Sequence, residues 1–595
     1  MDRIARHTLI ASLLLALPAC TEAPPAEAGD GEWDAIPTGK ADGVLDPDSD
    51  EAKAVLLLVN DRDVTLEELD DDARLDVRAA RNIIEHRNPD GIWDTDDDNR
   101  IDDVPELDAI GYVGPRAFGR LVEYAIAQGY LALVQDAEPD ETMTDVVFSP
   151  QPSESTHNQR VADLIDQAQD TIDVAMYSYS NATVRAALEA AAARGVEIRF
   201  LYETAAEDRR LDGDELQSSR SGQLEAHGID VRWVNKIMHH KFMIIDGPRA
   251  DLERASTATI ASGSANWSNS AGTRYDENTL FLRGHDEVAL RLQKEFNHLW
   301  AHSRALDANP DLAWTLSEVD ITDADIVDGD DSHVFFTSEN FDVSAGGDTF
   351  RKNGGNEVSD QLIAAIERAT DSIHVASGHL RHRGVSEALM AKRAADPDID
   401  IRVYLDAQEY ISAYTHDLQV EDLEDCLADA STDTQTRNCM DSGFRFGYQL
   451  GESGIDVRYK WYAYRWHYTY AAQMHHKYLL IDGDELWTGS YNLSDNAEHN
   501  TFENMMMFRG DDYAQLVAAY EANFETMWET GRAEDLLGQV REEIATADVI
   551  PMTYESMALE HDEVRDLKSL VLDNCAEANS NDFRRNPQNH LVCYR

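Results

Sequence analysis

The sequence is poor in positive charge, in cysteine and in long apolar runs. Lys and Arg number 51 against 114 Asp and Glu, which gives a formal net charge of -63 over 595 residues. Such a surface repels polyanions over roughly a Debye length, about 8–10 Å in physiological salt. Nucleic-acid-binding proteins usually carry a basic footprint instead. The deficit therefore disfavours a nucleic-acid partner and is typical of an extracellular or salt-adapted surface.

The N-terminus has the features of an export signal. Arg3 and Arg6 precede the apolar run LIASLLLALPA, which is too short to span a bilayer and ends at Cys20. The string LPAC resembles the lipobox of bacterial lipoproteins, which implies cleavage of residues 1–20 and lipidation of Cys20. An ordinary signal peptide cut near Ala19 is the alternative. Either way we expect an exported protein, and with lipidation a membrane-anchored lipoprotein of the bacterial cell envelope, in the periplasm or at the cell surface.

Of the five cysteines, the four beyond Cys20 fall into two local pairs. Cys426 is near Cys439, and Cys575 is near Cys593. Local pairs in an exported chain favour disulfides, and no CxxC spacing suggests a structural metal site. We therefore predict the disulfides Cys426–Cys439 and Cys575–Cys593 and no bound metal.

The N-terminal part of the chain is predicted to be a tether followed by a small helical domain. Residues 21–50 are rich in Ala, Pro, Gly and Asp without an apolar period, which is typical of a flexible linker. Residues 51–135 read as helices, and LDAIGYVGPRAFGRL within them resembles a helix-hairpin-helix element, a fold that often holds DNA phosphates. Tyr112 replaces its first hairpin glycine and its flanks are acidic. We therefore expect a structural or protein-contact role.

Most of the remaining chain contains two copies of the same sequence motifs. MHHKFMIID at 238–246 returns as MHHKYLLID at 474–482, and GSANWSNSA at 263–271 returns as GSYNLSDNA at 489–497. A helix, strand, helix, strand pattern precedes each copy. The order predicts two α/β halves, 155–310 and 335–535, with largely parallel sheets covered by helices on both faces. A helical tail with a disulfide, 536–595, follows.

The repeated strands align polar side chains on one face. His239 and Lys241 are two residues apart and share a face of an extended strand, while His240 points to the other face. Ser264 and Asn266 share a face of the next strand in the same way. The second half repeats this set with His475, Lys477, Ser490 and Asn492. If the halves pack face to face, two imidazoles and two ammonium groups converge.

This set of groups suits a phosphodiester. Two ammonium groups and several neutral donors form a cradle for phosphate oxygens. Two imidazoles of pKa about 6.5 can hold opposite protonation states near neutral pH. One acts as nucleophile and the other as general acid. We predict cleavage through a covalent phosphohistidine, after which the second imidazole activates water. No carboxylate cluster converges with these groups, so no catalytic metal or cofactor is expected.

Each half carries HxKxxxxD followed by GSxN, and over roughly residues 155–535 this resembles the phospholipase D superfamily. The resemblance implies a pseudo-twofold α/β sandwich with the active site at the seam between the halves. It implies catalytic residues at His239, Lys241, Asp246, Asn266, His475, Lys477, Asp482 and Asn492, with supporting roles for Ser264, Ser490, Glu277 and Glu503.

The resemblance also suggests how these roles divide. The Asp246 and Asp482 positions are usually structural in the family or support the histidines. Glu277 and Glu503 match carboxylates that orient a histidine in similar enzymes; solvated acids at strand ends are the alternative. By analogy His239 is the nucleophile and His475 the acid/base, although the near symmetry of the sequence leaves this open.

The superfamily includes phospholipases, phosphatidyl-transferring synthases and nucleases. The lipobox, the net charge and an aromatic insert at 459–473, read as an interfacial rim, favour lipid. The insert can also pack on itself as a hairpin or stack bases, and the string around IDVAMYSYS resembles the small endonuclease branch. We expect a monomeric phospholipase D-like hydrolase acting on glycerophospholipids. The alternatives are a metal-independent endonuclease, a cardiolipin-synthase-like transferase or a non-enzymatic surface interaction protein.

Overall fold

The computed structural model divides into two units at residue 138. It describes residues 45, 49–62, 64–88, 99, 101, 104–131, 142–306, 318–327, 329, 331–440, 443–462, 471–547, 550, 554–580, 582–583, 586 and 593. The predicted export signal with Cys20 and most of the predicted linker lie outside these residues. None of the helices in the described ranges combines the length and hydropathy that a membrane-spanning segment needs.

The first unit is helical. It contains α1 (Asp50–Asn60), α2 (Val77–Arg87), α3 (Val104–Ala109) and α4 (Pro115–Ala127). The predicted hairpin corresponds to α3, a tight turn and α4, which begins with a proline at its first turn, where the missing N–H costs nothing. Tyr112 occupies the turn with a left-handed φ of 69° and is 63% exposed. Asn82 on α2 donates a hydrogen bond to the Gly111 carbonyl, 2.7 Å away, which ties the turn to its neighbour.

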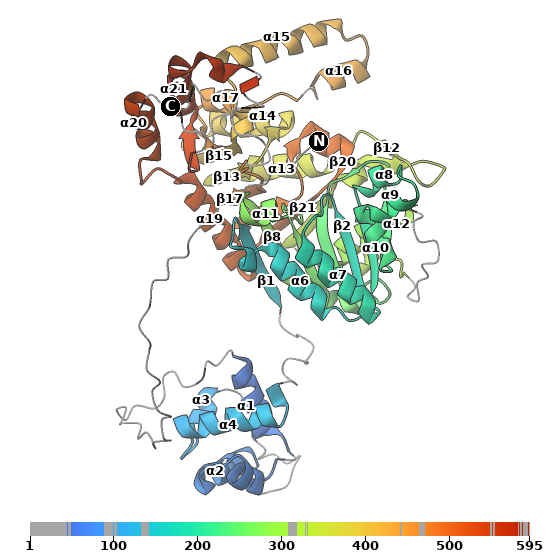
Figure 1. The fold of residues 1–595 in the computed structure, drawn as a ribbon, viewed down its shortest axis with the longest axis vertical. Helices are drawn as coiled ribbons and strands as arrows, with labels where there is room; N and C mark the ends of the chain where they lie inside the picture. The colour runs from blue at the N-terminus through green and yellow to red at the C-terminus, as the bar shows by residue number, and fades with distance from the viewer. Residues whose placement is uncertain are drawn as a thin grey trace, which may run out of the picture. The chain divides into compact units, whose positions relative to one another are not determined.

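The second unit contains two eight-stranded sheets with matching strand order (Figure 1). The first sheet has the order β1-β8-β7-β6-β2-β3-β4-β9, and the second has the order β10-β21-β18-β17-β13-β15-β16-β22. The strands of the first sheet are β1 (Met143–Ser149), β2 (Thr171–Met176), β3 (Glu197–Tyr202), β4 (Asp230–Trp233), β6 (Lys241–Ile245), β7 (Thr259–Gly263), β8 (Glu277–Arg283) and β9 (Arg304–Ala305). Those of the second are β10 (Ser332–Phe336), β13 (Ser372–Ser377), β15 (Asp400–Asp406), β16 (Asp456–Trp461), β17 (Lys477–Ile481), β18 (Glu485–Gly489), β21 (Asn504–Arg509) and β22 (Met557–Glu560).

The sheets are mixed, so the prediction of largely parallel sheets is wrong. In the first half only β2, β3 and β4 run parallel to one another, and the other neighbouring pairs are antiparallel. The physical reason is the kind of connection. Helices connect β2, β3 and β4, and a crossover helix allows parallel pairing. The links joining β6, β7 and β8, residues 246–258 and 264–276, each contain only one helix of five residues and return the chain in the opposite direction.

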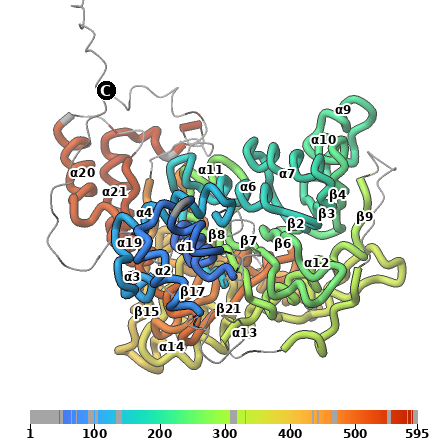
Figure 2. The backbone as a smooth tube through the Cα atoms, turned by 90° about the horizontal axis from the view of Figure 1, so that it is seen from below, coloured from blue at the N-terminus to red at the C-terminus, as the bar shows by residue number. Residues whose placement is uncertain are grey.

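Helices cover both faces of each sheet, as predicted. On the outer faces, α6 (His157–Gln167) and α7 (Ala182–Arg194) pack on the first sheet, and α13 (Glu357–Arg368) and α14 (Arg383–Ala395) pack on the second (Figures 1 and 2). The inner faces share one core with α12 (Asp286–Ala301) and α19 (Ala514–Trp528). Because this core draws on both sheets, the two halves form one packed body.

The C-terminal tail is part of the second half. Its strand β22 pairs antiparallel with β16 and adds an edge to the sheet, flanked by α20 (Leu536–Ala547) and α21 (His561–Asn574). The first sheet likewise begins at β1, before the predicted boundary at residue 155. The other short helices and strands are α8 (Ala205–Asp208), α9 (Gly213–Ser218), α10 (Arg220–Ala226), α11 (Asn269–Thr273), α17 (Gly447–Glu452), α18 (Asp495–Asn500), β5 (Ile237–Met238), β11 (Phe341–Val343), β12 (Phe350–Lys352), β14 (Leu380–Arg381), β19 (Leu493–Ser494) and β20 (Thr501–Phe502).

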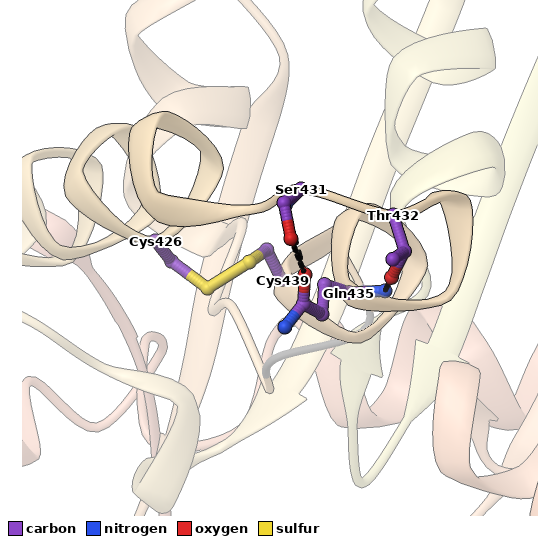
Figure 3. Close-up of a disulfide and its surroundings, with 5 residues drawn as sticks. All are labelled: Cys426, Ser431, Thr432, Gln435 and Cys439. Atoms are coloured by element: carbon purple, nitrogen blue, oxygen red, sulfur yellow. Dashed lines mark hydrogen bonds between the residues drawn. A yellow bond between two sulfur atoms is a disulfide. The ribbon is translucent and has the colours of Figure 1, made fainter.

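Both predicted disulfides are confirmed. Cys426 and Cys439 join α15 (Ala413–Asp429) to α16 (Asp433–Met440), and Figure 3 shows the bond beside the Ser431–Gln435 hydrogen bond of the connecting turn. Cys575 and Cys593 close a loop of 18 residues after α21, with Cα atoms 5.5 Å apart. None of the residues of α15 is buried, so little of the protein packs against this helix. The disulfide therefore constrains a pair of helices that packing alone holds weakly.

Candidate active site at the seam between the halves

The two histidines stand immediately before the buried strands β6 and β17. All five residues of each strand are buried, which fixes the register and therefore the face on which each side chain lies. His240 faces away from His239, as predicted. It is fully buried, and its Nε2 lies 3.1 Å from Oε1 of Glu295 on α12.

Short strands cross the seam and pair each histidine segment with the other half. β5, directly before His239, runs parallel to β20 of the second half, and the His239 N–H donates to the Phe502 carbonyl at 3.0 Å. At the equivalent position of the other half, the His475 N–H donates to the carbonyl of Asp276 at 2.9 Å. The backbone therefore places each histidine next to the glutamate of the opposite half.

Each histidine forms a hydrogen bond with that glutamate. Nδ1 of His239 lies 2.8 Å from Oε2 of Glu503, and Nδ1 of His475 lies 2.8 Å from Oε1 of Glu277. The serines of the GSxN strands hold the carboxylates in turn: Ser264 donates to Glu277 at 2.8 Å, and Ser490 donates to Glu503 at 2.7 Å. Both glutamates are at most 1% exposed. The prediction that they orient the histidines is confirmed, and the alternative of solvated strand-end acids is wrong.

The two lysines lie against the imidazole rings. Nζ of Lys241 is 3.2 Å from both ring nitrogens of His239 and donates to its carbonyl at 2.7 Å. Nζ of Lys477 is 3.2 Å from Nδ1 of His475 and donates to its carbonyl at 2.7 Å. Each ammonium group is therefore fixed beside the ring of its own half.

Burial dominates the electrostatics of this cluster. It lowers the pKa of His239 and His475 well below the usual range, and the adjacent lysines lower it further. Burial also lowers the pKa of Lys241 to about 7 and that of Lys477 to about 8, and it raises the pKa of Glu277 and of Glu503 to about 7. Both rings are therefore neutral near pH 7. An anion bound here would favour the charged lysines again, because it supplies the opposite charge that burial denies them.

The two asparagines keep unused hydrogen-bonding capacity. The Oδ1 atoms of Asn266 and Asn492 are buried without a hydrogen-bond partner among the described residues. A buried polar group of this kind usually has a partner. His157 supports the first one, since its Nε2 lies 3.0 Å from the Asn266 carbonyl. These oxygens can only accept hydrogen bonds, so phosphate oxygens would be held by the Nδ2 groups of the same amides.

The aspartates of the motif do not reach the histidines. Asp246 and Asp482 follow β6 and β17 at the far end, seven residues after each histidine, which is about 23 Å of extended chain at roughly 3.3 Å per residue. Asp246 accepts hydrogen bonds from the backbone N–H groups of Gln169, Asp170 and Thr171. Asp482 does the same for residues 370–372. This corrects their place among the catalytic residues: both fix the loop that enters the neighbouring strand.

Sequence reasoning missed a second pair of buried carboxylates. Glu203 follows β3 and accepts from the Met238 N–H at 2.7 Å, and Asp406 at the end of β15 accepts from the Met474 N–H at 2.9 Å. Each therefore anchors the residue directly before a catalytic-motif histidine. Their repetition at the ends of EIRFLYE and DIRVYLD was a signal in the sequence. Tyr177 was also missed; its ring lies 4.5 Å from that of His239.

The aromatic insert is only partly described. Tyr459 and Trp461 belong to the buried core of the second half, at 0% and 7% exposure, so they are not part of an interfacial rim. Tyr464, Trp466, Tyr468 and Tyr470 lie outside the described residues. A cavity of about 450 Å³ lies near this region, lined by Arg274, Asp276, Tyr404 and Lys460 among others, but by none of the motif side chains.

Comparison with known proteins gives the same outline. The family described as "Cardiolipin synthase, PLD-like domain" matches residues 161–300 and 362–528. A mitochondrial cardiolipin hydrolase of Drosophila melanogaster is 26% identical over 155 residues, 24% of this chain and 57% of the relative. A phospholipase D of Rickettsia conorii is 28% identical over 137 residues, 23% of this chain and 61% of the relative. The chain thus spans little more than half the length of these curated relatives.

Among solved structures, a phospholipase D family member, Nuc, from Salmonella typhimurium matches 28% of this chain and 98% of its own, with 23% identity and a TM-score of 0.22. A phosphatidylserine synthase from Haemophilus influenzae matches 64% of this chain and 85% of its own, with 13% identity and a TM-score of 0.38.

Proposed function

Because this chain belongs to the phospholipase D superfamily, we propose that it hydrolyses glycerophospholipids to phosphatidic acid and a headgroup alcohol. The observation that carries the proposal is the reciprocal pairing of His239 with Glu503 and of His475 with Glu277. Two oriented imidazoles, two lysines and the Nδ2 donors of two asparagines form a site for one phosphodiester group. Both halves of the site come from one chain, so we propose that the monomer is active.

In the first step, Nε2 of His239 attacks phosphorus and forms an N–P bond. Nδ1–H of the same ring donates to Glu503, which stabilises the positive charge that the ring acquires. The P–O bond to the headgroup breaks, and His475 delivers its proton to the departing oxygen. The binding of the anionic phosphate supports this protonation state, because it raises the basicity of the neighbouring imidazole.

In the second step, the now neutral His475 accepts a proton from water. The water oxygen attacks phosphorus, the N–P bond breaks, and its electron pair returns to His239. Lys241, Lys477 and the amides of Asn266 and Asn492 hold the non-bridging oxygens in both steps. The proton and electron balance closes within these groups, so the mechanism requires no metal or cofactor.

Three observations support a lipid substrate. The net charge of -63 penalises binding of a nucleic-acid strand. Curated relatives include proteins named mitochondrial cardiolipin hydrolase and phospholipase D. The LPAC string ending at Cys20 supports an exported, membrane-anchored protein in the cell envelope. We therefore favour hydrolysis of membrane lipid over nucleic-acid cleavage or phosphatidyl transfer.

The test is a parallel substrate assay on the purified chain. Vesicles of phosphatidylcholine or cardiolipin and a supercoiled plasmid are incubated with the wild type, with His239→Asn and with His240→Asn. We expect phosphatidic acid from vesicles, an intact plasmid, loss of turnover in His239→Asn and retained turnover in His240→Asn. Plasmid nicking without lipid hydrolysis contradicts the lipid proposal, and full activity of His239→Asn contradicts the nucleophile.

A further inference from the structure

A second cluster of ligand-type side chains lies apart from the seam, between β13 and α19 of the second half. His374 projects from β13, and Glu521 and Glu525 project from successive turns of α19. One ligand atom of each lies within 4.8 Å of the others. His374 is 4% exposed and stacks on Phe524, with ring centroids 4.7 Å apart. The imidazole is therefore held in one orientation.

The hydrogen bonds of His374 leave one nitrogen facing a carboxylate. Its Nε2 lies 3.3 Å from Oδ2 of Asp400 and can donate a hydrogen bond to that carboxylate. Nδ1 is the other ring nitrogen. It lies 2.8 Å from Oε1 of Glu521 but makes no hydrogen bond with any described residue. At this distance the two atoms need a positive charge shared between them, either a proton on Nδ1 or a metal ion bound by both atoms.

The charges around the cluster are also unbalanced. Asp400, Glu521 and Glu525 supply three carboxylates. Among the described residues Arg402 hydrogen-bonds to two of them, to Asp400 at 2.6 Å and to Glu525 at 2.7 Å. The carboxylates therefore outnumber the guanidinium by two, which a divalent cation would balance. A neutral imidazole whose other nitrogen donates to a carboxylate is the usual arrangement at protein metal sites.

The first half shows how the same position is satisfied without an ion. There Asp173 pairs across the sheet with Arg199, as His374 pairs with Arg402. Asp173 bonds to the guanidinium groups of both Arg199 and Arg249. The α12 residues at this position are the neutral amides Gln293 and Asn297. The second half has one guanidinium where the first has two, and carboxylates where the first has amides.

We propose that Nδ1 of His374 and the carboxylates of Glu521 and Glu525 bind one divalent first-row transition-metal ion, of which Zn²⁺ is the reference. One imidazole and two carboxylates are ligands that Zn²⁺ accepts, with water in the fourth position. The ion fastens α19 to β13. Tyr520, next to Glu521, donates to Oδ1 of Asn278, whose Nδ2 lies 3.0 Å from Nδ1 of His476. The ion is structural and takes no part in the phosphodiester chemistry.

The test compares metal binding by the whole chain and by variants that copy the first half. Purified wild type, Glu521→Gln/Glu525→Asn, His374→Gln and the control Glu424→Gln, an exposed acid on α15, are dialysed with Zn²⁺ and then against metal-free buffer. Metal is counted by mass spectrometry, and Co²⁺ is titrated with the visible absorption recorded. Circular dichroism shows which variants are folded.

We expect one Zn²⁺ per chain in the wild type and the control, a visible Co²⁺ spectrum, and at least tenfold weaker binding in the double variant and in His374→Gln. Chelation should lower the thermal midpoint of the wild type by a few degrees and leave that of the double variant unchanged. No retained zinc in the wild type overturns the proposal. Equal retention in the folded variants also overturns it. The lipid assay does not depend on either outcome.

Discussion

Replacing Glu503 by Gln tests whether the glutamates act through the histidines of the opposite half. The change keeps the shape of the side chain and removes one negative charge 2.8 Å from Nδ1 of His239. In the proposed mechanism this ring becomes positive in the transition state as it bonds to phosphorus. We expect kcat to fall while KM stays within about threefold, because the lost interaction exists mainly when the ring is charged.

The size of the effect follows from the geometry. Two unit charges about 4 Å apart at an effective dielectric of about 20 interact with about 4 kcal/mol. A hydrogen bond to a charged group contributes roughly 1.5–3 kcal/mol, against about 1 for a neutral one. A glutamine keeps the neutral bond, so the net loss is about 2–4 kcal/mol. That corresponds to a decrease in kcat of roughly 30- to 1000-fold.

The molecule offers a matched control for this variant. Glu295 is a buried carboxylate that contacts His240 and accepts a hydrogen bond from Ser338, which repeats the Glu503 arrangement on the opposite face of the strand. Glu295→Gln should therefore cost stability but leave kcat nearly unchanged. Both variants are assayed on phosphatidylcholine vesicles at saturating substrate. The reasoning is refuted if Glu503→Gln keeps kcat within about threefold, or if Glu295→Gln loses as much.

Three further outcomes are expected. Burial lowers the pKa of Lys241 to about 7 and that of Lys477 to about 8, so kcat/KM, which reports the free enzyme, should fall as pH rises through 7–8. The value of kcat should persist to higher pH. A fall of kcat and kcat/KM at the same pH would contradict this. Asp246→Ala removes the acceptor of three backbone N–H groups, at about 1 kcal/mol each, so urea unfolding should show a free energy of unfolding lower by about 2–4 kcal/mol. The kcat of this variant should stay within about twofold of the wild type. A large fall in kcat would show that Asp246 has a catalytic role. Cys20→Ser should move the protein from the membrane to the soluble fraction, and unchanged membrane retention would argue against a lipid anchor.

Local sequence patterns were enough to predict much of the site. Two-residue spacing placed His239 and Lys241 together and turned His240 away, because side-chain direction alternates along a strand whatever surrounds it. The local cysteine pairs were also predicted correctly. These features depend on short-range geometry, which neighbouring residues decide.

The features that sequence reasoning missed depend on long-range packing. Glu277 and Glu503 were assigned to histidine orientation, but the crossing of each pair to the opposite half depends on the β5–β20 pairing, which joins residues far apart in the chain. The strand β22 in the tail pairs with β16 for the same reason. The direction of the strands was wrong because alternation of helices and strands was given more weight than the link after MHHKYLLI. Only residues 482–484 separate β17 from β18, too few for a crossover helix.

Each histidine is supported by the glutamate of the opposite half, so the support of both histidines depends on how the two halves are positioned relative to each other. If the halves slide or tilt relative to each other, both histidines lose their hydrogen bonds to the glutamates at the same time. No state then keeps only one of the two histidines oriented. Expressed as separate fragments, the halves would be inert and would regain turnover only on reassembly. The proposed hydrolysis would therefore depend on the whole interface being intact.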